Sequence, residues 1–258
     1  IIEIEGSNSL HLVTEHMQYG DLRKAMVCFE DGLMSEQSIR LIMIQIASAT
    51  AHLHCVHSVA HRDIKPENIL CEGPDPTMVG CLKLCDFGCC RRFESLSDPA
   101  FDDPIGSASY FAPELASAYV ADGPVLYAGA PADVWAIGAI AYELIHGAPP
   151  YYSANQTKED MMQRMARDHL LESKEPVAYP ETSFSEISAA GNQFVRQLLT
   201  CAPKERASVE EALSLSWLQP MTDPAQRTRM AEPGSPDVAA RRARATQQFR
   251  AAGKKVML

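Results

Sequence analysis

The stretch His61-Arg62-Asp63-Ile64-Lys65-Pro66-Glu67-Asn68-Ile69-Leu70 decides how the remaining sequence is interpreted. It places acidic, basic and amide side chains together between two apolar segments, where a simple connection would need none of them. Pro66 fixes its own φ angle and disfavours helix at the residue before it, so a rigid, non-helical loop is expected. A loop that points Asp63, Lys65 and Asn68 in fixed directions suits catalysis.

A second polar turn follows at Lys83-Leu84-Cys85-Asp86-Phe87-Gly88. The segment begins like a strand and ends in a carboxylate and a glycine that permits a sharp turn. Asn68 and Asp86 together offer amide and carboxylate oxygens. Such ligands suit Mg²⁺, which binds one or two carboxylates together with substrate phosphates.

Three motifs in this order resemble the signature of the protein kinase family: the His61–Asn68 loop, Asp86-Phe87-Gly88 and Ala112-Pro113-Glu114. The resemblance implies ATP-dependent phosphorylation of proteins, with ATP and Mg²⁺ as cofactors. It also implies that the imidazole of His61 packs against the ring of Phe87 and does no chemistry.

The resemblance assigns a role to each polar side chain of the loop. It implies that Asp63 accepts the proton of the substrate hydroxyl and that Lys65 neutralises charge on the transferred phosphoryl group. Asn68 and Asp86 would hold Mg²⁺. Arg62 would order the activation segment.

The segment after the first two apolar runs resembles the kinase hinge and the start of the large lobe. On that match the adenine of ATP meets the gatekeeper Thr14 and the backbone at Glu15 and Met17. Asp21 lies near the ribose, and Leu70 belongs to the floor beneath the adenine. Taken alone, the same stretch is a strand followed by a loop.

The polar segment from Asp86 to Glu114 resembles an activation segment that ends in the substrate-docking loop of serine/threonine kinases. Ser107 stands where threonine is usual, and with Lys65 it favours serine or threonine acceptors. Asp103 occupies a place where many kinases carry a phosphorylated threonine, so an ion pair with Arg62 is expected to replace the phosphate. A solvated aspartate is the alternative.

Substrate preference is predicted from three acidic residues. Asp21, Glu67 and Glu143 match positions that, in basophilic kinases, contact arginines before the acceptor residue. Substrates are therefore expected to carry arginine two or three positions before the serine or threonine. The net charge of −10 is compatible with a basic peptide and argues against nucleic acid as a partner.

Several scaffold contacts are expected as well. A helix should begin at its N-cap Ser35 and bury residues at helical spacing up to Leu53. By the resemblance, Asp133 bonds the backbone of the catalytic loop, Arg206 pairs with Glu114, Trp217 closes the lobe, and Ile140 and Leu144 support the adenine floor. The histidines His52, His54 and His57 are interpreted as structural.

The eight cysteines and the apolar segments bear on compartment. With no secretory leader and no run of about 18 uncharged apolar residues, the protein is expected in the cytosol or nucleus, without a membrane partner and with reduced thiols. Cys81, Cys85, Cys89 and Cys90 lack the paired spacing of a zinc site. Cys85 is a candidate reactive thiol, although plain packing explains it too.

The expected fold is α+β and kinase-like. Residues 1–219 form a partial kinase domain, with a hairpin and hinge of the small lobe in 1–19 and the mostly helical large lobe in 20–219. Residues 220–258 form a tail that, from residue 221 on, has eight basic and three acidic side chains. Its segment Gln247–Leu258 resembles the junction of calcium-dependent protein kinases, so a calcium sensor is a possible partner.

The 258 residues hold no Gly-x-Gly-x-x-Gly loop and no lysine before the hinge. A complete kinase needs both to hold ATP phosphates. We expect them upstream of Ile1, and we expect these 258 residues alone to be weakly active or inactive. The alternative is a non-catalytic pseudokinase or regulatory fragment that binds peptides.

Overall fold

The structure is a computed structural model, and it describes residues 2–3, 10–11, 13–28, 34–73, 82–97, 99–153, 155–171, 177–179 and 187–219. The α-helices are α1 (Leu22–Cys28), α2 (Glu36–Ala51), α3 (Pro113–Val120), α4 (Gly129–His146), α5 (Lys158–Leu170), α7 (Ala189–Leu198) and α8 (Val209–Ser214). A π-helical turn and three 3-10 turns join them: η1 (His52–Val56), η2 (Pro66–Asn68), η3 (Phe87–Cys89) and η4 (Ala108–Tyr110).

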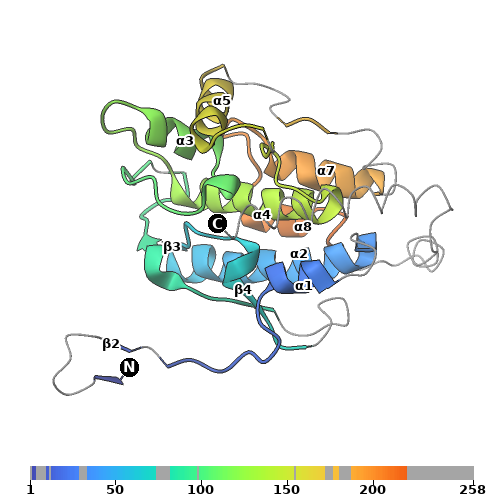
Figure 1. Ribbon diagram of the computed structural model, residues 1–258. Coiled ribbons are helices and arrows are strands. Elements are labelled where there is room, and N and C mark those ends of the chain that lie inside the picture. Colours follow the sequence, from blue (N-terminus) through green and yellow to red (C-terminus); the bar gives the residue numbers. More distant parts are fainter. Residues whose placement is uncertain are drawn as a thin grey trace.

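The strands are short and pair antiparallel: β1 (Ile2–Glu3) with β2 (Leu10–His11), β3 (Val59–Ala60) with β6 (Arg91–Arg92), and β4 (Ile69–Cys71) with β5 (Leu82–Leu84). The predicted hairpin is present as the antiparallel pairing of β1 with β2. It stands away from the helical body (Figure 1). Mostly helical with small sheets, the fold is α+β, as expected.

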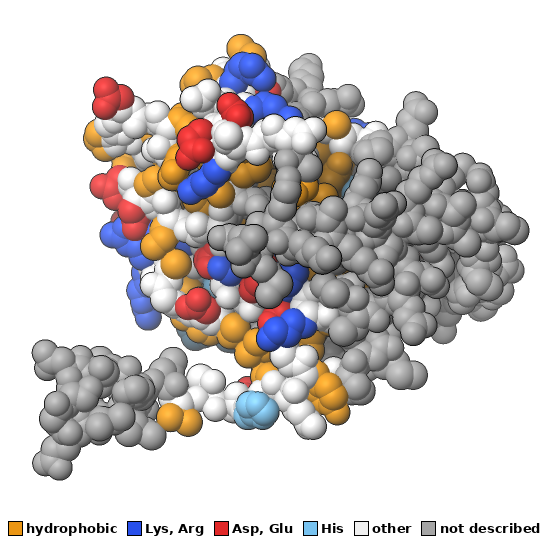
Figure 2. Space-filling view, viewed as in Figure 1, with side chains coloured by type: hydrophobic (Ala, Val, Ile, Leu, Met, Phe, Trp, Pro, Cys, Tyr) orange, Lys and Arg blue, Asp and Glu red, His pale blue; other side chains and the backbone are white. Residues whose placement is uncertain are grey.

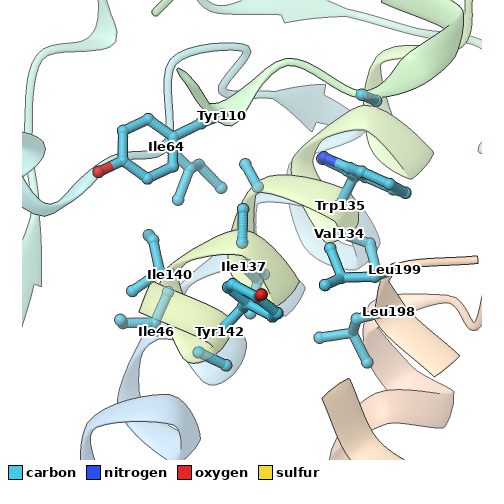
Figure 3. Close-up of a cluster of buried hydrophobic side chains, with 14 of the residues drawn as sticks. Ile46, Ile64, Tyr110, Val134, Trp135, Ile137, Ile140, Tyr142, Leu198 and Leu199 are labelled. Atoms are coloured by element: carbon cyan, nitrogen blue, oxygen red, sulfur yellow. The ribbon is translucent and has the colours of Figure 1, made fainter. Parts of the chain in front are cut away.

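Helix α4 runs through the middle of the body, with α3 and α5 on one side and α1 and α2 on the other (Figure 1). It is buried over most of its length because nearly all of its side chains are apolar or small. In Figure 3, Ile137 and Ile140 of α4 lie among Ile46 of α2 and Leu198 of α7. This core carries the segments that form the site on its surface.

Helix α2 begins where the sequence predicted. The Ser35 hydroxyl accepts a hydrogen bond from the Ser38 amide at 3.1 Å, which caps the first turn. Of the residues expected to face the core, Leu53 at the predicted end is only half-buried, because α2 ends at Ala51 and η1 follows. The fully buried ones are Ile39, Ile42, Met43, Ile46, Ala47 and Thr50. Together with η1, the helix is long and apolar enough to cross a bilayer, but its apolar face packs inside the domain, against α4, α8 and β5.

Charges are mixed on the surface: Lys and Arg side chains alternate with Asp and Glu over the face in Figure 2. The tail from residue 220 and Cys81 lie outside the described residues, so the predictions made for them are not addressed by the fold.

Candidate active site

The His61–Asn68 loop of the site is held in place by one buried carboxylate. Asp133 of α4, 1% exposed, accepts hydrogen bonds from the backbone amides of His61 and Arg62, each at 2.7 Å. It also contacts the His54 imidazole at 2.8 Å. Arg62 has a φ of 67°, which is unfavourable for a residue with a side chain. Asp133 therefore fixes a strained backbone immediately before Asp63.

Asp63 has one oxygen engaged and one free. Its Oδ2 accepts hydrogen bonds from Lys65 Nζ at 2.7 Å and from Asn68 Nδ2 at 3.1 Å. Its Oδ1 is buried and has no hydrogen-bond partner within the described part of the chain. A fixed carboxylate with one unpaired oxygen is suited to accept a hydrogen bond from a substrate hydroxyl that displaces the atoms now covering that oxygen.

Lys65 connects the loop to the segment that precedes α3. Its ammonium group donates to Ser107 Oγ at 2.8 Å while it donates to Asp63. The structure therefore brings together the three predicted residues Asp63, Lys65 and Ser107. The Lys65 ammonium group thus joins the Ser107 hydroxyl to the Asp63 carboxylate through Oδ2.

Asn68 and Asp86 lie at the same end of the antiparallel pair formed by β4 and β5. Strand β4 begins directly after Asn68, β5 ends two residues before Asp86, and the Cys85 amide donates to the Asn68 carbonyl at 2.9 Å. Asp86 has a φ of 60° and an exposed side chain. The Asn68 amide nitrogen is committed to Asp63, so the side-chain oxygen is the group left for a metal. This oxygen-rich donor set fits Mg²⁺.

The turn after Asp86 packs on the loop as expected. The rings of His61 and Phe87 have centroids 5.4 Å apart, and His61 Nε2 lies 3.0 Å from the Cys85 carbonyl oxygen. The imidazole is therefore fully used in packing and in this backbone contact, and the predicted structural role of His61 fits its surroundings.

The predicted nucleotide side is more open. Thr14 and Glu15 are exposed, Met17 is half-buried, and Glu15 pairs with Lys83 at 2.5 Å. Asp21 forms a β-bridge with Leu70. The Asp21 carboxylate accepts from the Lys24 amide at 2.9 Å and so caps α1, a structural role that the sequence analysis did not predict.

The predicted ion pair between Arg62 and Asp103 is present and has two parallel bonds. Arg62 Nη1 and Nη2 donate to the two carboxylate oxygens at 2.8 Å each. Arg91 of β6 adds a third bond at 2.9 Å, a partner that the sequence analysis missed. The hydrogen bond from Arg62 lowers the pKa of Asp103, and burial opposes that shift only in part.

Glu67 and Glu143 converge, as predicted, although they come from distant parts of the chain. Both bind the chain's own Arg23, at 2.8 Å and 2.7 Å. The hydroxyl of Tyr110 donates to Glu143 at 2.6 Å. The sequence analysis missed Arg23, and its only signal was a basic residue directly after the Asp21-Leu22 start of a short helix.

The sequence matches the family described as protein kinase domain over residues 2–218. The chain belongs to the protein kinase family. It is 31% identical over 217 residues to a probable myosin light chain kinase of Dictyostelium discoideum, covering 83% of this chain and 55% of that protein.

Two further relatives are kinases of vertebrates. Serine/threonine-protein kinase 17A of Oryctolagus cuniculus is 29% identical over 229 residues, which are 88% of this chain and 52% of the relative. MAP kinase-interacting serine/threonine-protein kinase 1 of Xenopus tropicalis is 33% identical over 198 residues, 72% and 46% of the two chains. The chain thus spans about half the length of these relatives.

The predicted pair of Glu114 and Arg206 is present and buried. Arg206 donates to both carboxylate oxygens at 2.7 Å and 2.9 Å. The guanidinium also lies over the Trp135 ring, 5.1 Å from its centroid. The pair ties the end of the activation segment to the loop before α8.

The thiols near the kinase site are poorly suited to reactivity. Burial raises the pKa of Cys85, and the neighbouring Asp86 carboxylate raises it further. Burial also raises the pKa of Cys90 to about 12. Because the thiolate is the nucleophile, these shifts argue against Cys85 as a reactive thiol and favour packing. The free cysteines are Cys55, Cys71, Cys85, Cys89, Cys90 and Cys201.

Proposed function

We propose that the protein transfers the γ-phosphoryl group of ATP to serine or threonine side chains of other proteins. The observation that carries the proposal is the state of Asp63: one oxygen is held by Lys65 and Asn68, and the other is buried without a partner among the described residues. Family membership supports the same reaction.

The chain's own residues then have distinct tasks. The substrate hydroxyl donates to Asp63 Oδ1, which takes its proton as the hydroxyl oxygen bonds to the γ-phosphorus. The bond from that phosphorus to the bridging oxygen breaks, and ADP leaves. Lys65 keeps the Asp63 carboxylate aimed and places positive charge beside the transferred group.

Asn68 and Asp86 would hold Mg²⁺, which when bound neutralises charge on the phosphates. The segment that contains Thr14, Glu15 and Met17 would contact the adenine, and Asp21 would lie near the ribose. The backbone bridge between Asp21 and Leu70 joins this segment to the catalytic loop.

The test is Asp63→Asn in the full-length protein, assayed with a serine or threonine peptide and labelled ATP. The exchange keeps the shape and the bonds to the loop but removes the proton acceptor, so we expect a loss of at least about 10²-fold in kcat. Unchanged thermal stability should accompany that loss. Peptide binding without any transfer in the unmodified protein would favour the non-catalytic alternative. The 258 residues alone should phosphorylate the peptide about 10²- to 10³-fold more slowly than the unmodified full-length protein, because they lack the glycine loop and its hydrogen-bond donors.

We also propose that the tail binds a calcium sensor, because its segment Gln247–Leu258 resembles the junction of calcium-dependent protein kinases. The basic residues Arg250, Lys254 and Lys255 lie between the apolar Phe249 and Leu258, as in helices that bind calcium sensors. A peptide of residues 237–258 should bind calcium-loaded calmodulin and inhibit the full-length kinase. A peptide that does neither would leave the tail without this role.

A further inference from the structure

One charged cluster in the lobe has no task in phosphoryl transfer. It consists of Arg23 of α1, Glu67 of η2, Tyr110 of η4 and Glu143 of α4, and it is called the Arg23 cluster below. Four elements that are distant in sequence meet here. The Arg23 side chain is 21% exposed and that of Glu143 is 4% exposed.

The bonds in the cluster leave Arg23 firmly held. Its Nε donates to Glu67 at 2.8 Å, and its Nη1 and Nη2 donate to Glu143 at 2.7 Å and 3.3 Å. Its Nη2 also donates to the Tyr110 hydroxyl, which in turn donates to Glu143. Burial disfavours the charge on Arg23, but the combined attraction of Glu143, Tyr110 and Glu67 outweighs burial and raises the pKa of the guanidinium.

The cluster needs a cation. Two carboxylates, one of them almost fully buried, bind the same guanidinium, and a buried carboxylate without a partner is strongly unfavourable. Any guanidinium that reaches Glu67 and Glu143 would satisfy both. In this chain the guanidinium comes from inside the protein.

The cluster also lies next to the position where the acceptor serine of a substrate peptide would bind. Glu67 follows Asp63 by four positions in the same loop, and Tyr110 follows Ser107 by three positions. Ser107 and Asp63 are joined through Lys65. A peptide whose serine reaches Asp63 therefore runs close to Glu67 and Glu143, the residues matched above to arginine recognition.

We propose that Arg23 occupies, from within the chain, the subsite that would otherwise receive an arginine of the substrate, so that this kinase selects acceptor peptides without relying on arginine there. The inference rests on the proposed function and revises the expected preference for basic substrates. Glu67 Oε2 is buried and has no hydrogen-bond partner among the described residues, so Arg23 fills the subsite without pairing every carboxylate oxygen in it.

The experiment compares peptides that differ only in arginine or alanine at each of the five positions before one serine. For the unmodified full-length protein we expect ratios of kcat/KM, arginine over alanine, below about threefold at every position. In Arg23→Met, which keeps the apolar stem, and in Arg23→Gln, one position should rise to at least about tenfold, mainly through KM. Adding Glu67→Gln to either variant should return that ratio toward the unmodified value.

Arg92→Met is the control, since Arg92 is an exposed arginine of β6 that belongs neither to the Arg23 cluster nor to the catalytic loop. It should leave all ratios as they are. Thermal unfolding checks that each variant folds. If either Arg23→Met or Arg23→Gln fails to fold, the other one is used for the comparison. The same peptides are also tested for binding by fluorescence anisotropy, which requires no turnover.

Two results would overturn the proposal. One is a folded Arg23 variant whose arginine ratios, in turnover and in binding, equal those of the unmodified protein. The other is an unmodified protein that already prefers arginine more than tenfold through Glu67. Loss of all phosphorylation with intact arginine discrimination in binding would instead count against the proposed function alone.

Discussion

Arg62 shows how one residue serves two neighbours through different atoms. Its backbone amide donates to Asp133, and its guanidinium, 2% exposed, donates to both oxygens of Asp103 and lies 5.0 Å from the centroid of the Phe101 ring. The first contact fixes the loop that carries Asp63. The second contact fixes the activation segment, so the order of that segment depends on the Asp103 carboxylate and does not require a phosphate group.

Asp103→Asn should therefore lower kcat of the full-length kinase by about fivefold to tenfold. A hydrogen bond to a charged group contributes about 1.5–3 kcal/mol, and the half-exposed position of Asp103 reduces this to about 1 kcal/mol. Activity is to be measured without prior phosphorylation. Asp102→Asn is the control, because Asp102 is exposed and should have no effect. Equal activity of both variants would refute the role of the ion pair.

The same pair predicts a pH dependence. The pKa of Asp103 is lowered from 3.8, so its contribution is complete above its unfolded pKa and is lost only as pH falls through the lower folded value. Between pH 5 and pH 8 the ratio of unmodified to Asp103→Asn activity should stay constant. A phosphate in place of Asp103, with a second pKa of about 6, would make that ratio change in this range.

Single residues divide clearly into those that the sequence predicted and those that it did not. Asp63, Lys65 and Asn68 share one short loop, so their mutual contacts follow from a rigid backbone and a known motif. Arg23 and Arg91 were missed because a surface-type arginine carries no local sign of its partner. Their partners, Glu143 and Asp103, are set by tertiary packing.

Among elements, the helices were easier to predict than the strands. The start of α2 at Ser35 follows from a cap and a 3.6-residue apolar period, both of which are local. The pairs β3–β6 and β4–β5 have two or three residues each, too few for a period, and their partners lie at least ten residues away. Pairing of that kind depends on the packed helices beneath it.

At the level of elements, the pair of Glu114 in α3 and Arg206 before α8 should be costly to break. Glu114→Ala leaves a fully buried guanidinium without its counter-charge, so we expect the free energy of unfolding to fall by about 3–5 kcal/mol. Urea denaturation measures the change. Glu205→Ala, next to Arg206 but exposed, is the control.

A second variant distinguishes an unpaired charge from lost packing. Combining Glu114→Leu with Arg206→Met removes both charges and keeps apolar volume, so part of the lost stability should return. If the double variant is no more stable than Glu114→Ala, the loss comes from packing or from the carbonyl contacts of Arg206 instead.

Across the whole molecule, α2 joins segments that are far apart in sequence. Glu36 Oε1 accepts hydrogen bonds from Trp217 Nε1 at 2.8 Å and from the Ser188 amide at 3.0 Å. Arg40 donates to the Trp217 carbonyl at 2.5 Å. The packing is tight: a Cβ on Gly191 would come within 2.9 Å of both Glu36 Oε1 and Trp217 Nε1.

These contacts predict that the described lobe unfolds as one unit. Glu36→Ala removes an acceptor that buried donors share, so the free energy of unfolding should fall by about 2–4 kcal/mol. Gln37→Ala is the matched control, because Gln37 is exposed on the same turn. Far-UV circular dichroism reports the helices. All variants also carry Trp135→Phe, so that the tryptophan fluorescence comes from Trp217 alone and reports the C-terminal end of the lobe. Because Trp217 is tied to α2, both probes should shift to lower urea together and by the same amount. A fluorescence transition that moves alone, while the helical signal keeps its midpoint, would mean that the segment around Trp217 detaches separately and that Glu36 does not hold the lobe together.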